Sequence, residues 1–523
     1  MAKSNPRRYI LIGAADDLSA DTLLDFPSVP ASIALGALAG AGMAMEKTRG
    51  LRSALKGIIT SSGQRDPAIK IVRSLHENGP KLVEMEPSDA LALRAAKPGV
   101  KVIDEVFYRL ASFDLVRARL SRKAARSKLA NAALPKSGAK GITVRVTDKE
   151  GKPIVGATVV AYWNLDAELE DHGETKKDGA VRLRTKEPIE RLYVQPRSGY
   201  WSRTLHDLSV EAGQELPVVL ESLDLSYEDG LKYFYGAKRA SAKAGEKVRV
   251  AVIDGGVGPH PDVEVSSGQN FTGTESETLY EDNGIGHGTH VAGIIAGRSD
   301  GKRGYRGLAP GVELFSYRVC SRNDENLSNF ALGAAIEAAV KSECHLINLS
   351  LAQKGSDEYV ELCVGESWKR GCLVIAAAGN ERQEAVGFPA AMPTAIGVSA
   401  FGRKQTFPKD AAESETIDKP LGDDKKNFFA SFSNRGPGLD FTAPGVGIVS
   451  TFPGGGYATM SGTSMACPVV TGMAARLFSE HPEVLALPAT QARSEAMAKL
   501  LFSRAKPLGF GAHYEGYGLC VKI

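Results

Sequence analysis

The sequence predicts an α/β fold with a doubly wound parallel sheet in its C-terminal half, preceded by a small α+β domain and a small β-sandwich. The stretch 248–253 is apolar except for Arg249, which is typical of a parallel strand buried on both faces. Similar runs at 345–351 and 372–377 alternate with an amphipathic helix at 330–340, the order expected of a doubly wound sheet. A chain of 523 residues also exceeds what one hydrophobic core can hold, so we expect several domains.

The first domain is expected over residues 1–112, where short strands and helices alternate. The strands are predicted at 8–13, 69–75, 81–85 and 100–108. The helices are predicted at about 30–55 and from Ser88, as the N-cap, to about residue 96. The resulting order, β-α-β-β-α-β, is a split βαβ arrangement.

A basic linker is expected over residues 113–140. Its one acidic residue is Asp114, and its first half is crowded with basic residues: Arg117, Arg119, Arg122, Lys123, Arg126 and Lys128. Such a stretch could bind nucleic acid, but a solvated, protease-sensitive connector is the simpler interpretation, and we adopt it.

The pattern changes over residues 141–222, where short strands recur at regular spacing. The stretch 142–146 alternates apolar and polar residues, as a half-buried strand does, and Asp178-Gly179 is a typical hairpin turn. These features predict the small β-sandwich. The α/β domain is then expected over residues 226–523.

Composition excludes some classes of function. The net charge of +3 is small for this length and argues against nucleic acid or an anionic membrane as the main partner. No signal peptide is predicted, because Asp16 and Asp17 interrupt the apolar run at 9–15. The six cysteines form no CxxC pair and are expected to be buried thiols. We therefore expect a cytoplasmic protein, the alternative being an exported one with one or two disulfides.

Three segments of the α/β region place a reactive side chain at the end of a strand or the start of a helix. Asp254 ends the strand at 248–253, where open α/β sheets bind ligands, although alone it is an ordinary turn residue. His287 lies among small residues before an apolar helix. Ser464 precedes another apolar helix. Alone it would be an N-cap, but the helix N-terminus would also stabilise an anion formed there.

His287 and His290 could together form a metal pair. No Glu completes an H-E-x-x-H motif, however, and no third ligand is evident. We therefore expect no metal at this position and a structural, hydrogen-bonded His290.

Taken together, these segments resemble the subtilisin-like serine proteases, the subtilases. The matching blocks are Asp254-Gly-Gly, His287-Gly-Thr-His-Val-Ala-Gly and Gly462-Thr-Ser464-Met-Ala, in the subtilisin order Asp, His, Ser. The resemblance covers about residues 226–523 and implies a subtilisin-like fold and a serine endopeptidase acting through an acyl-enzyme. His287 would take the proton of Ser464, and Asp254 would orient the imidazole. Gly255, where the family usually has Thr or Ser, is expected to loosen the support of Asp254.

The resemblance also implies residues for substrate binding. Asn380, in the block Ala376-Ala-Ala-Gly379-Asn380, would donate to the oxyanion. The segment Ser350-Leu351-Ala352 would pair with an extended peptide, which implies broad specificity. Gly379 and Gly387 would line the pocket for the residue before the cut bond, where we expect a large apolar side chain.

No cofactor is expected to be required. Structural calcium is a weak expectation, because Asp262 matches a family position that often ligates it, whereas the basic loop at 298–308 is unlike an oxygen-rich calcium loop.

The two leading domains resemble known families as well. The segments at 81–87 and 100–106 resemble the subtilase propeptides, which implies an autoinhibited precursor whose N-terminal region is its own inhibitor, and we predict self-cleavage between about residues 108 and 140. The run from Thr147 to Ala157 resembles the carboxypeptidase-regulatory-like sandwiches, which dock or space other domains. The alternative to a protease acting on peptides or proteins is a non-catalytic or partner-gated peptide-binding protein.

Overall fold

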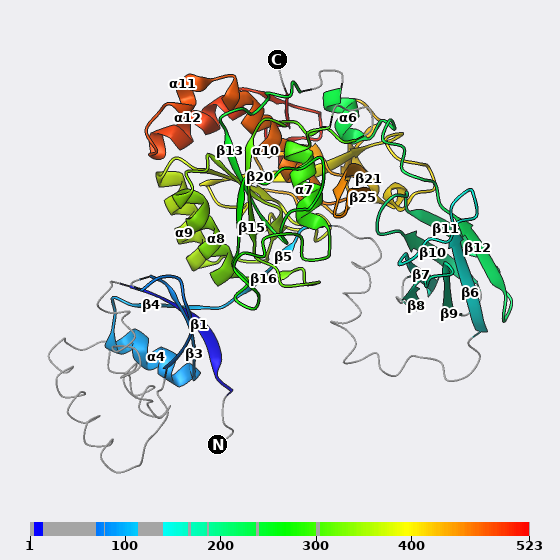
Figure 1. Cartoon of the computed structure of the whole chain (residues 1–523), viewed down its shortest axis with the longest axis horizontal. Coiled ribbons are helices and arrows are strands. Elements are labelled where there is room, and N and C mark those ends of the chain that lie inside the picture. Colours follow the sequence, from blue (N-terminus) through cyan, green and yellow to red (C-terminus); the bar gives the residue numbers. More distant parts are fainter. Residues whose placement is uncertain are drawn as a thin grey trace, which may run out of the picture. The chain divides into compact units, whose positions relative to one another are not determined.

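The computed structural model describes residues 5–13, 69–77, 79–112, 140–165, 169–185, 188–236, 240–299 and 304–521 (Figure 1). The helix expected at 30–55 and the linker residues 113–139 lie outside the described residues. The chain forms two compact units. The first comprises the chain up to Phe107 with the short segments Ser328–Ala334 and Asp357–Val360, and the second comprises the rest.

The N-terminal part of the first unit is a four-stranded antiparallel sheet in the order β2-β3-β1-β4. Its strands are β1 (Arg7–Ile12), β2 (Ile69–Ser74), β3 (Lys81–Met85) and β4 (Lys101–Asp104). Helix α4 (Pro87–Ala96) packs Ala90 and Leu93 into the small core of this sheet.

Two expectations for this unit are corrected. The helix begins at Pro87, whose fixed φ suits the first helical position, and Ser88 is therefore inside the helix and not its N-cap. The strand expected at 100–108 is divided into β4 and β5 (Phe107–Leu110), which belong to different sheets.

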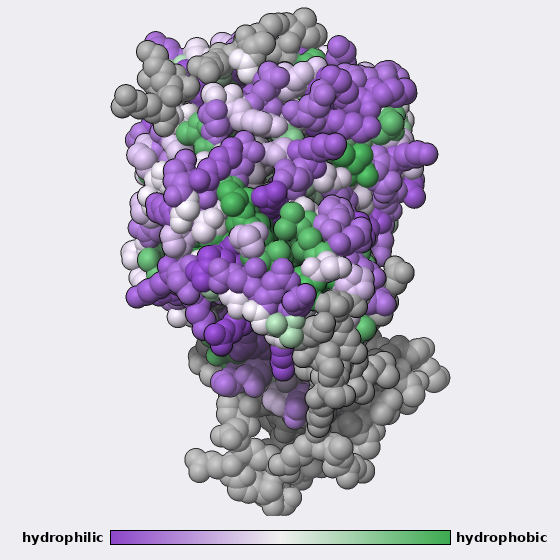
Figure 2. Space-filling view, turned by 90° about the vertical axis from the view of Figure 1, so that its right-hand side faces the viewer, coloured by the Kyte–Doolittle hydropathy of each residue, from purple (hydrophilic) through white to green (hydrophobic). Residues whose placement is uncertain are grey.

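Residues 140–222 form two facing sheets, here called the two-sheet domain. One sheet has the order β11-β10-β7-β8: β11 (Arg203–Leu208), β10 (Ile189–Gln195), β7 (Thr158–Asn164) and β8 (Leu169–Glu174). The other has the order β12-β6-β9: β12 (Glu215–Val219), β6 (Lys140–Thr147) and β9 (Ala180–Thr185). In β9 the buried residues Val181 and Leu183 alternate with exposed Arg182 and Arg184, as in a sheet with one wet face. The side of the molecule on which this domain lies is mainly hydrophilic, with small apolar patches (Figure 2).

A nine-stranded sheet forms the centre of the α/β domain. Its order is β14-β15-β13-β17-β19-β20-β22-β21, with β23 pairing on β20. The strands are β13 (Arg249–Asp254), β14 (Ser267–Asn270), β15 (Glu313–Arg318), β17 (Leu346–Leu349), β19 (Leu373–Ala377), β20 (Ala395–Arg403), β21 (Ile417–Leu421), β22 (Asn427–Ala430) and β23 (Phe441–Pro444). All pairs are parallel except those of β21 and β22. The strand order reverses on either side of β13, so this sheet is doubly wound, as expected, and ligands of such sheets bind beyond the carboxyl end of the strands at this point.

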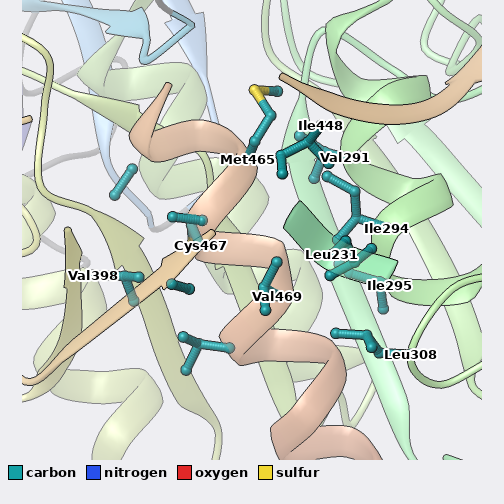
Figure 3. Close-up of a cluster of buried hydrophobic side chains, with 14 of the residues drawn as sticks. Leu231, Val291, Ile294, Ile295, Leu308, Val398, Ile448, Met465, Cys467 and Val469 are labelled. Atoms are coloured by element: carbon teal, nitrogen blue, oxygen red, sulfur yellow. The ribbon is translucent and has the colours of Figure 1, made fainter. Parts of the chain in front are cut away.

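Helices cover both faces of this sheet. Figure 1 shows α8 (Asn329–Lys341) and α9 (Glu358–Lys369) on the opposite face from α7 (His287–Ala296) and α10 (Thr463–Ser479). Val291 and Ile294 of α7 and Met465 and Val469 of α10 point into one apolar core, because both helices present buried side chains to it (Figure 3). This core fixes the first residues of α7 and α10, where His287 and Ser464 lie.

The remaining elements are short. The helices are α6 (Gly230–Tyr235), α11 (Pro482–Leu485), α12 (Gln491–Phe502), α13 (Ala512–Glu515) and the 3-10 helix η4 (Ala412–Thr416). The strands are β16 (Asn326–Ser328), β18 (Leu351–Ala352), β24 (Ile448–Phe452), β25 (Gly456–Met460), β26 (Ala505–Lys506) and β27 (Leu519–Cys520). Across the described part of the chain, no helix has the length and apolar character needed to cross a membrane.

Candidate active site

A buried carboxylate and imidazole meet at the carboxyl end of β13. Asp254 is the last residue of this strand, and His287 is the first residue of α7. The Nδ1 of His287 lies 2.8 and 2.9 Å from the two carboxylate oxygens of Asp254. Burial lowers the pKa of His287, but the charge of Asp254 and its hydrogen bond outweigh burial and raise this pKa above the ordinary value. The pair can therefore hold a proton on the ring.

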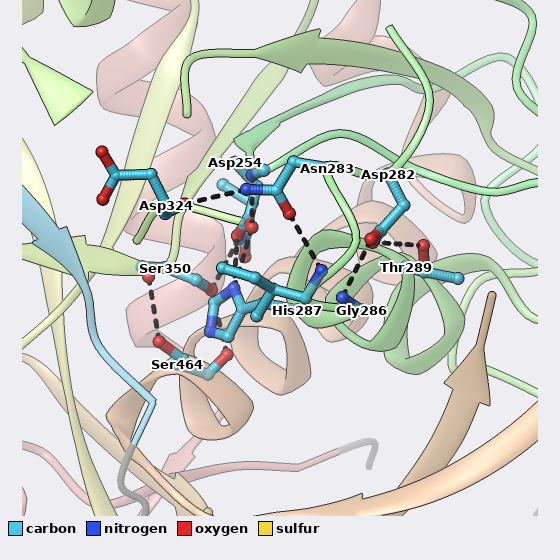
Figure 4. A network of polar contacts seen from close by, with 12 residues as sticks. Asp254, Asp282, Asn283, Gly286, His287, Thr289, Asp324, Ser350 and Ser464 are labelled. Atoms are coloured by element: carbon cyan, nitrogen blue, oxygen red, sulfur yellow. Dashed lines mark hydrogen bonds and ion pairs between the residues drawn. The ribbon is translucent and has the colours of Figure 1, made fainter. Parts of the chain in front are cut away.

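The loop before His287 is fixed by a second carboxylate. Asp282 accepts hydrogen bonds from the backbone N–H groups of Gly284 and Gly286, at 2.8 and 2.9 Å, and from the Thr289 hydroxyl at 2.9 Å (Figure 4). Gly286 has φ +87°, and a Cβ there would lie 2.1 Å from the ring of Phe452, so only glycine fits. The start of α7 is thus set by contacts that the sequence blocks did not indicate.

The space beside Gly255 is occupied by Asn283. A Cβ on Gly255 would lie 2.9 Å from the Asn283 Oδ1. The Nδ2 of Asn283 donates to the carbonyls of Ser321 and Asp324, at 3.0 and 2.8 Å. The amide of Asn283 therefore lies against Gly255 and ties this turn to the loop after β15.

The hydroxyl of Ser464 lies at the start of α10. Figure 4 shows the His287 ring between Asp254 and Ser464. The hydroxyl donates to the Ser350 carbonyl at 2.9 Å, and the Ser350 hydroxyl donates to the Ser464 carbonyl at 2.9 Å. The buried Nε2 of His287 has no hydrogen-bond partner within the described residues. The ring nitrogen that faces away from Asp254 is thus available to a group in the cleft.

Two N–H donors converge near this serine on one carbonyl oxygen, that of Ala111. The Ser464 backbone N–H donates to it at 3.1 Å, and the Asn380 Nδ2 also donates to it. The amide of Asn380 is oriented by Thr463, whose N–H and hydroxyl donate to its Oδ1 at 3.0 and 2.9 Å. Its NH₂ group therefore faces the cleft, as an oxyanion donor requires.

The segment that carries Ala111 lies in the cleft as an added strand. Residues of β5 pair antiparallel with β18, with Leu110 opposite Leu351 and Arg109 opposite Ala352. The Ala111 N–H donates to the Ser350 carbonyl at 3.0 Å, and the Leu110 N–H donates to that of Glu325 at 3.1 Å. Sequence reasoning placed Ser350, Leu351 and Ala352 along a bound peptide, but it did not identify which residues occupy the cleft.

Gly379 and Gly387, which were expected to line the pocket for the residue before the cut bond, both lie beside Ala352. A Cβ on Gly387 would lie 3.1–3.2 Å from the Ala378 carbonyl oxygen, the Ala352 Cβ and the Gln353 carbonyl oxygen. Gly379 has φ +98°, and a Cβ there would lie 2.6 Å from the carboxylate of Glu381. Neither position therefore has room for a side chain without a shift of its neighbours.

His290 has the structural role expected of it. Its buried Nε2 lies 3.0 and 3.2 Å from the carbonyls of Ile448 and Ala458, and burial lowers its pKa to about 3. Among the described residues no group of three or more His, Cys, Asp or Glu side chains could hold a metal ion. The carboxylate of Asp262 accepts instead from the Tyr305 N–H and the Tyr457 hydroxyl, so the described surroundings of Asp262 do not fit calcium.

The six cysteines lie within the described residues, and none forms a disulfide. Five are buried, as expected, and Cys363 is partly exposed. Cys467 lies one helical turn after Ser464. Burial is the main reason that the pKa of its thiol is raised. It is therefore a neutral packing residue of α10.

Comparison with known proteins agrees with this site. The Subtilase family matches residues 245–518, more than half of the chain. The thermostable alkaline protease of Halalkalibacterium halodurans is 37% identical over 239 residues, 46% of this chain and 58% of that protein. Subtilisin BL of Lederbergia lenta is 36% identical over 256 residues, 47% of this chain and 85% of that protein. The M-protease of Shouchella clausii is 36% identical over 326 residues, 61% of this chain and 73% of that protein.

A doubly wound sheet with this cleft at the carboxyl end of its strands defines a subtilisin-like serine endopeptidase. The chain belongs to the subtilase family.

Proposed function

We propose that this chain hydrolyses peptide bonds through a triad of Asp254, His287 and Ser464 and an acyl-enzyme. The observation that supports it most is the position of the Ala111 carbonyl. Its oxygen accepts from the Ser464 N–H and from Asn380, next to the buried Asp254–His287 pair. A carbonyl held in this way is polarised and placed for attack by a nearby hydroxyl.

The proposed reaction has two halves. The Ser464 hydroxyl turns from the Ser350 carbonyl toward the His287 Nε2, its oxygen attacks the carbonyl carbon, and its proton passes to the ring. The ring then gives this proton to the leaving amine as the C–N bond breaks, which leaves an ester on Ser464. A water molecule next gives a proton to His287, attacks the ester and releases the acid, and the proton returns to Ser464. Asp254 holds the ring in the required tautomer and stabilises its charged form.

In this proposal the chain is made as an autoinhibited precursor. It then cuts its own Ala111–Ser112 bond. This bond falls inside the interval predicted from the sequence. In support, residues 109–111 fill the cleft as a strand and exclude other peptides. After the cut, residues 1–111 would remain as an inhibitor bound through the same pairing.

Intact-mass analysis of purified protein tests this step. The wild type should lose residues 1–111 from its 55.5 kDa chain, with Ser112 as the new N-terminus, whereas Ser464→Ala should keep full mass. Thr463→Ser, which keeps the hydroxyl that orients Asn380, is the matched control and should be processed. Identical masses for the wild type and Ser464→Ala would contradict the proposal.

The filled cleft also favours a second candidate, an enzyme that stays inhibited until a partner removes its N-terminal region. A fluorophosphonate probe that labels Ser464 separates the two. Labelling of the purified full-length preparation supports self-activation. Labelling only after residues 1–111 are removed by another protease supports the gated enzyme, and no labelling in either case supports a non-catalytic peptide-binding protein.

The specificity proposed is broad, with a preference for a large apolar residue before the cut bond. Broad specificity follows from recognition through backbone pairing with β18 and β16. Gly379 and Gly387, which carry no side chain, support the apolar preference, although the chain's own residue there is Ala111. No cofactor has a role in this mechanism. Two locations are considered, the cytoplasm and export from the cell, and cell fractionation decides between them.

A further inference from the structure

In the sheet of β11, β10, β7 and β8, the two central strands β7 and β10 bury side chains on both faces. Along β7, Val159 and Ala161 point into the core between the two sheets of the domain. Val160 and Tyr162 point the other way and belong to the same apolar cluster as Phe407 of the α/β domain. A strand that served only as a spacer would have one wet face. The two-sheet domain is therefore part of the wall of the α/β domain.

Polar contacts fix this wall next to the site. The Ser202 hydroxyl donates to the Glu413 carboxylate at 2.6 Å, and both residues are buried. The Gly199 N–H donates to the Tyr457 carbonyl at 2.8 Å. A guanidinium N–H of Arg197 donates to the Gly284 carbonyl at 3.0 Å, three residues before His287. The edge of the two-sheet domain thus contacts the loop that leads to His287.

A cavity of about 660 Å³ lies between this edge and His287. Its lining includes Thr158, Glu174, Gln195 and Arg197 from the two-sheet domain. Thr158 is directly opposite Glu174 on β8 and Gln195 on β10, so the three side chains form a row on one face of the sheet.

The chain itself enters this cavity after the oxyanion donors. Ser112, the residue that follows Ala111, is part of the lining. With Ala111 as the last residue before the cut bond, Ser112 is the first residue of the leaving group. The cavity therefore extends to the leaving-group side of the cleft, and the two-sheet domain helps to build this side.

The lining of this cavity carries more negative than positive charge. Its carboxylates are those of Glu174, Asp324, Glu325 and Glu413. Its guanidinium groups are those of Arg197 and of Arg109, which belongs to the N-terminal segment. Glu174 and Asp324 are exposed to solvent. The sequence that follows Ser112 has the complementary charge, with six Arg or Lys residues over positions 117–128.

We propose that the two-sheet domain forms the leaving-group half of the substrate cleft, and that Glu174 on its edge selects peptides with Arg or Lys after the cut bond. The inference rests on the proposed protease function and adds a substrate class to it. It assigns a substrate-binding role to a domain that the sequence presents as a spacer or docking module.

Two quenched fluorogenic peptides test this selection. Both carry Tyr-Arg-Leu-Ala-Ser, and the next five residues include three arginines in one peptide and three glutamates in the other. The enzyme is used after its N-terminal segment has been cleaved and separated from it, and kcat/KM is measured for each peptide. The wild type should prefer the arginine peptide by about fivefold or more, and added salt should reduce this preference.

Charge variants assign the selection to Glu174. Glu174→Gln should reduce the preference and Glu174→Lys should bring it to about twofold or less, because a repulsion replaces an attraction. Glu211→Lys, an exposed residue of the same domain outside the cavity lining, should keep the wild-type ratio. Thermal unfolding of each variant checks that the domain is intact.

The outcomes separate the two levels of the proposal. A labelled, active enzyme that cleaves both peptides equally overturns the charge selection alone. An arginine preference that survives Glu174→Lys overturns the role of this edge. Failure to cleave either peptide, together with failure to react with a fluorophosphonate, overturns the protease function and this inference with it.

Discussion

The carbonyl oxygen of Ala111 accepts a hydrogen bond from the backbone N–H of Ser464 at 3.1 Å. These residues are more than 350 positions apart in the chain, and the pairing of β5 with β18 brings them together. In the proposed mechanism, the peptide group that follows Ala111 is the bond to be cut. The residues that lie in the candidate site are therefore known, and the role of each residue around them can be tested.

Loss of the Asn380 side chain should lower turnover with little change in KM. Asn380→Ala removes one of two donors to the oxyanion, and loss of the corresponding donor in a subtilisin costs about 10²–10³-fold in kcat. Thr463→Val should give a smaller loss, because it frees the amide that Thr463 orients. Steady-state kinetics on a peptide substrate measure both, and an unchanged kcat in Asn380→Ala would remove this residue from the mechanism.

The activity should fall on the acid side with a midpoint above pH 6.5. His287 acts as a base only when neutral, and although burial lowers its pKa, Asp254 raises it above the ordinary 6.5. Activity is therefore lost as the pH falls through this raised pKa. Asp254→Asn removes the attraction and leaves the effect of burial, so the midpoint should shift to lower pH while kcat drops about 10⁴-fold. The kcat/KM profile of both proteins is the measurement, and a midpoint that does not move would contradict the assignment.

Glu325 should select a basic residue three positions before the cut bond. Its carboxylate is largely buried, with 14% of the side chain exposed, and accepts from the Arg109 Nη2 and Nε at 2.8 and 3.2 Å. A peptide with Arg at this position should be cleaved about two- to fivefold faster than one with Glu. Glu325→Arg should invert this order, whereas Glu361→Arg on α9 should not. Equal rates for both peptides with the wild type would show that this ion pair does not affect selection.

A methyl group at Gly387 should reduce the size of residue that the pocket accepts. A Cβ there would lie 3.1–3.2 Å from three neighbouring atoms, so it would crowd the wall of the proposed pocket. Gly387→Ala should lower kcat/KM for a peptide with Phe before the cut bond much more than for one with Ala. Gly365→Ala, where a Cβ meets no atom within 4 Å, is the control. If the two peptides lose equally, Gly387 does not line the pocket.

The two-sheet domain and the α/β domain should unfold in one transition. Ser202→Ala deprives the buried Glu413 carboxylate of a donor and should cost about 1–3 kcal/mol in the free energy of unfolding. Ser226→Ala, at an exposed turn, should change it by less than about 0.5 kcal/mol. Chemical denaturation followed by circular dichroism measures these values. Two separate transitions in the wild type would mean that the domains are independent.

Local patterns in the sequence were sufficient to predict much of the α/β domain. The apolar run at 248–253 became β13, and the helix expected at 330–340 became α8. His287 and Ser464 were found through their motif blocks. Each lies at the start of a helix, and the glycine before the helix has a positive φ. Such patterns involve residues that are close together in the sequence. They predict helices and strands well because each of these elements is formed by neighbouring residues.

Contacts that depend on distant residues were not predicted. Nothing in Arg109-Leu-Ala111 marks it as a strand for the cleft, since its partners are supplied by β18 and β16, more than 200 residues away. Residues 159–163 of β7 do not alternate between apolar and polar, and only the contact with the α/β domain explains why both faces of this strand are apolar. The role of Asn283 beside Gly255 was missed for the same reason.

The shared core of the two-sheet domain also limits how this gene can change. Tyr162, Tyr193 and Trp201 would meet water if the domain were moved to another protein, and the α/β domain would lose part of the apolar cluster that the two domains share. Recombination that separates the two halves should therefore yield chains that aggregate. We expect substitutions on one side of this contact to be tolerated mainly when the other side changes as well, so that the pair is inherited as one evolutionary unit.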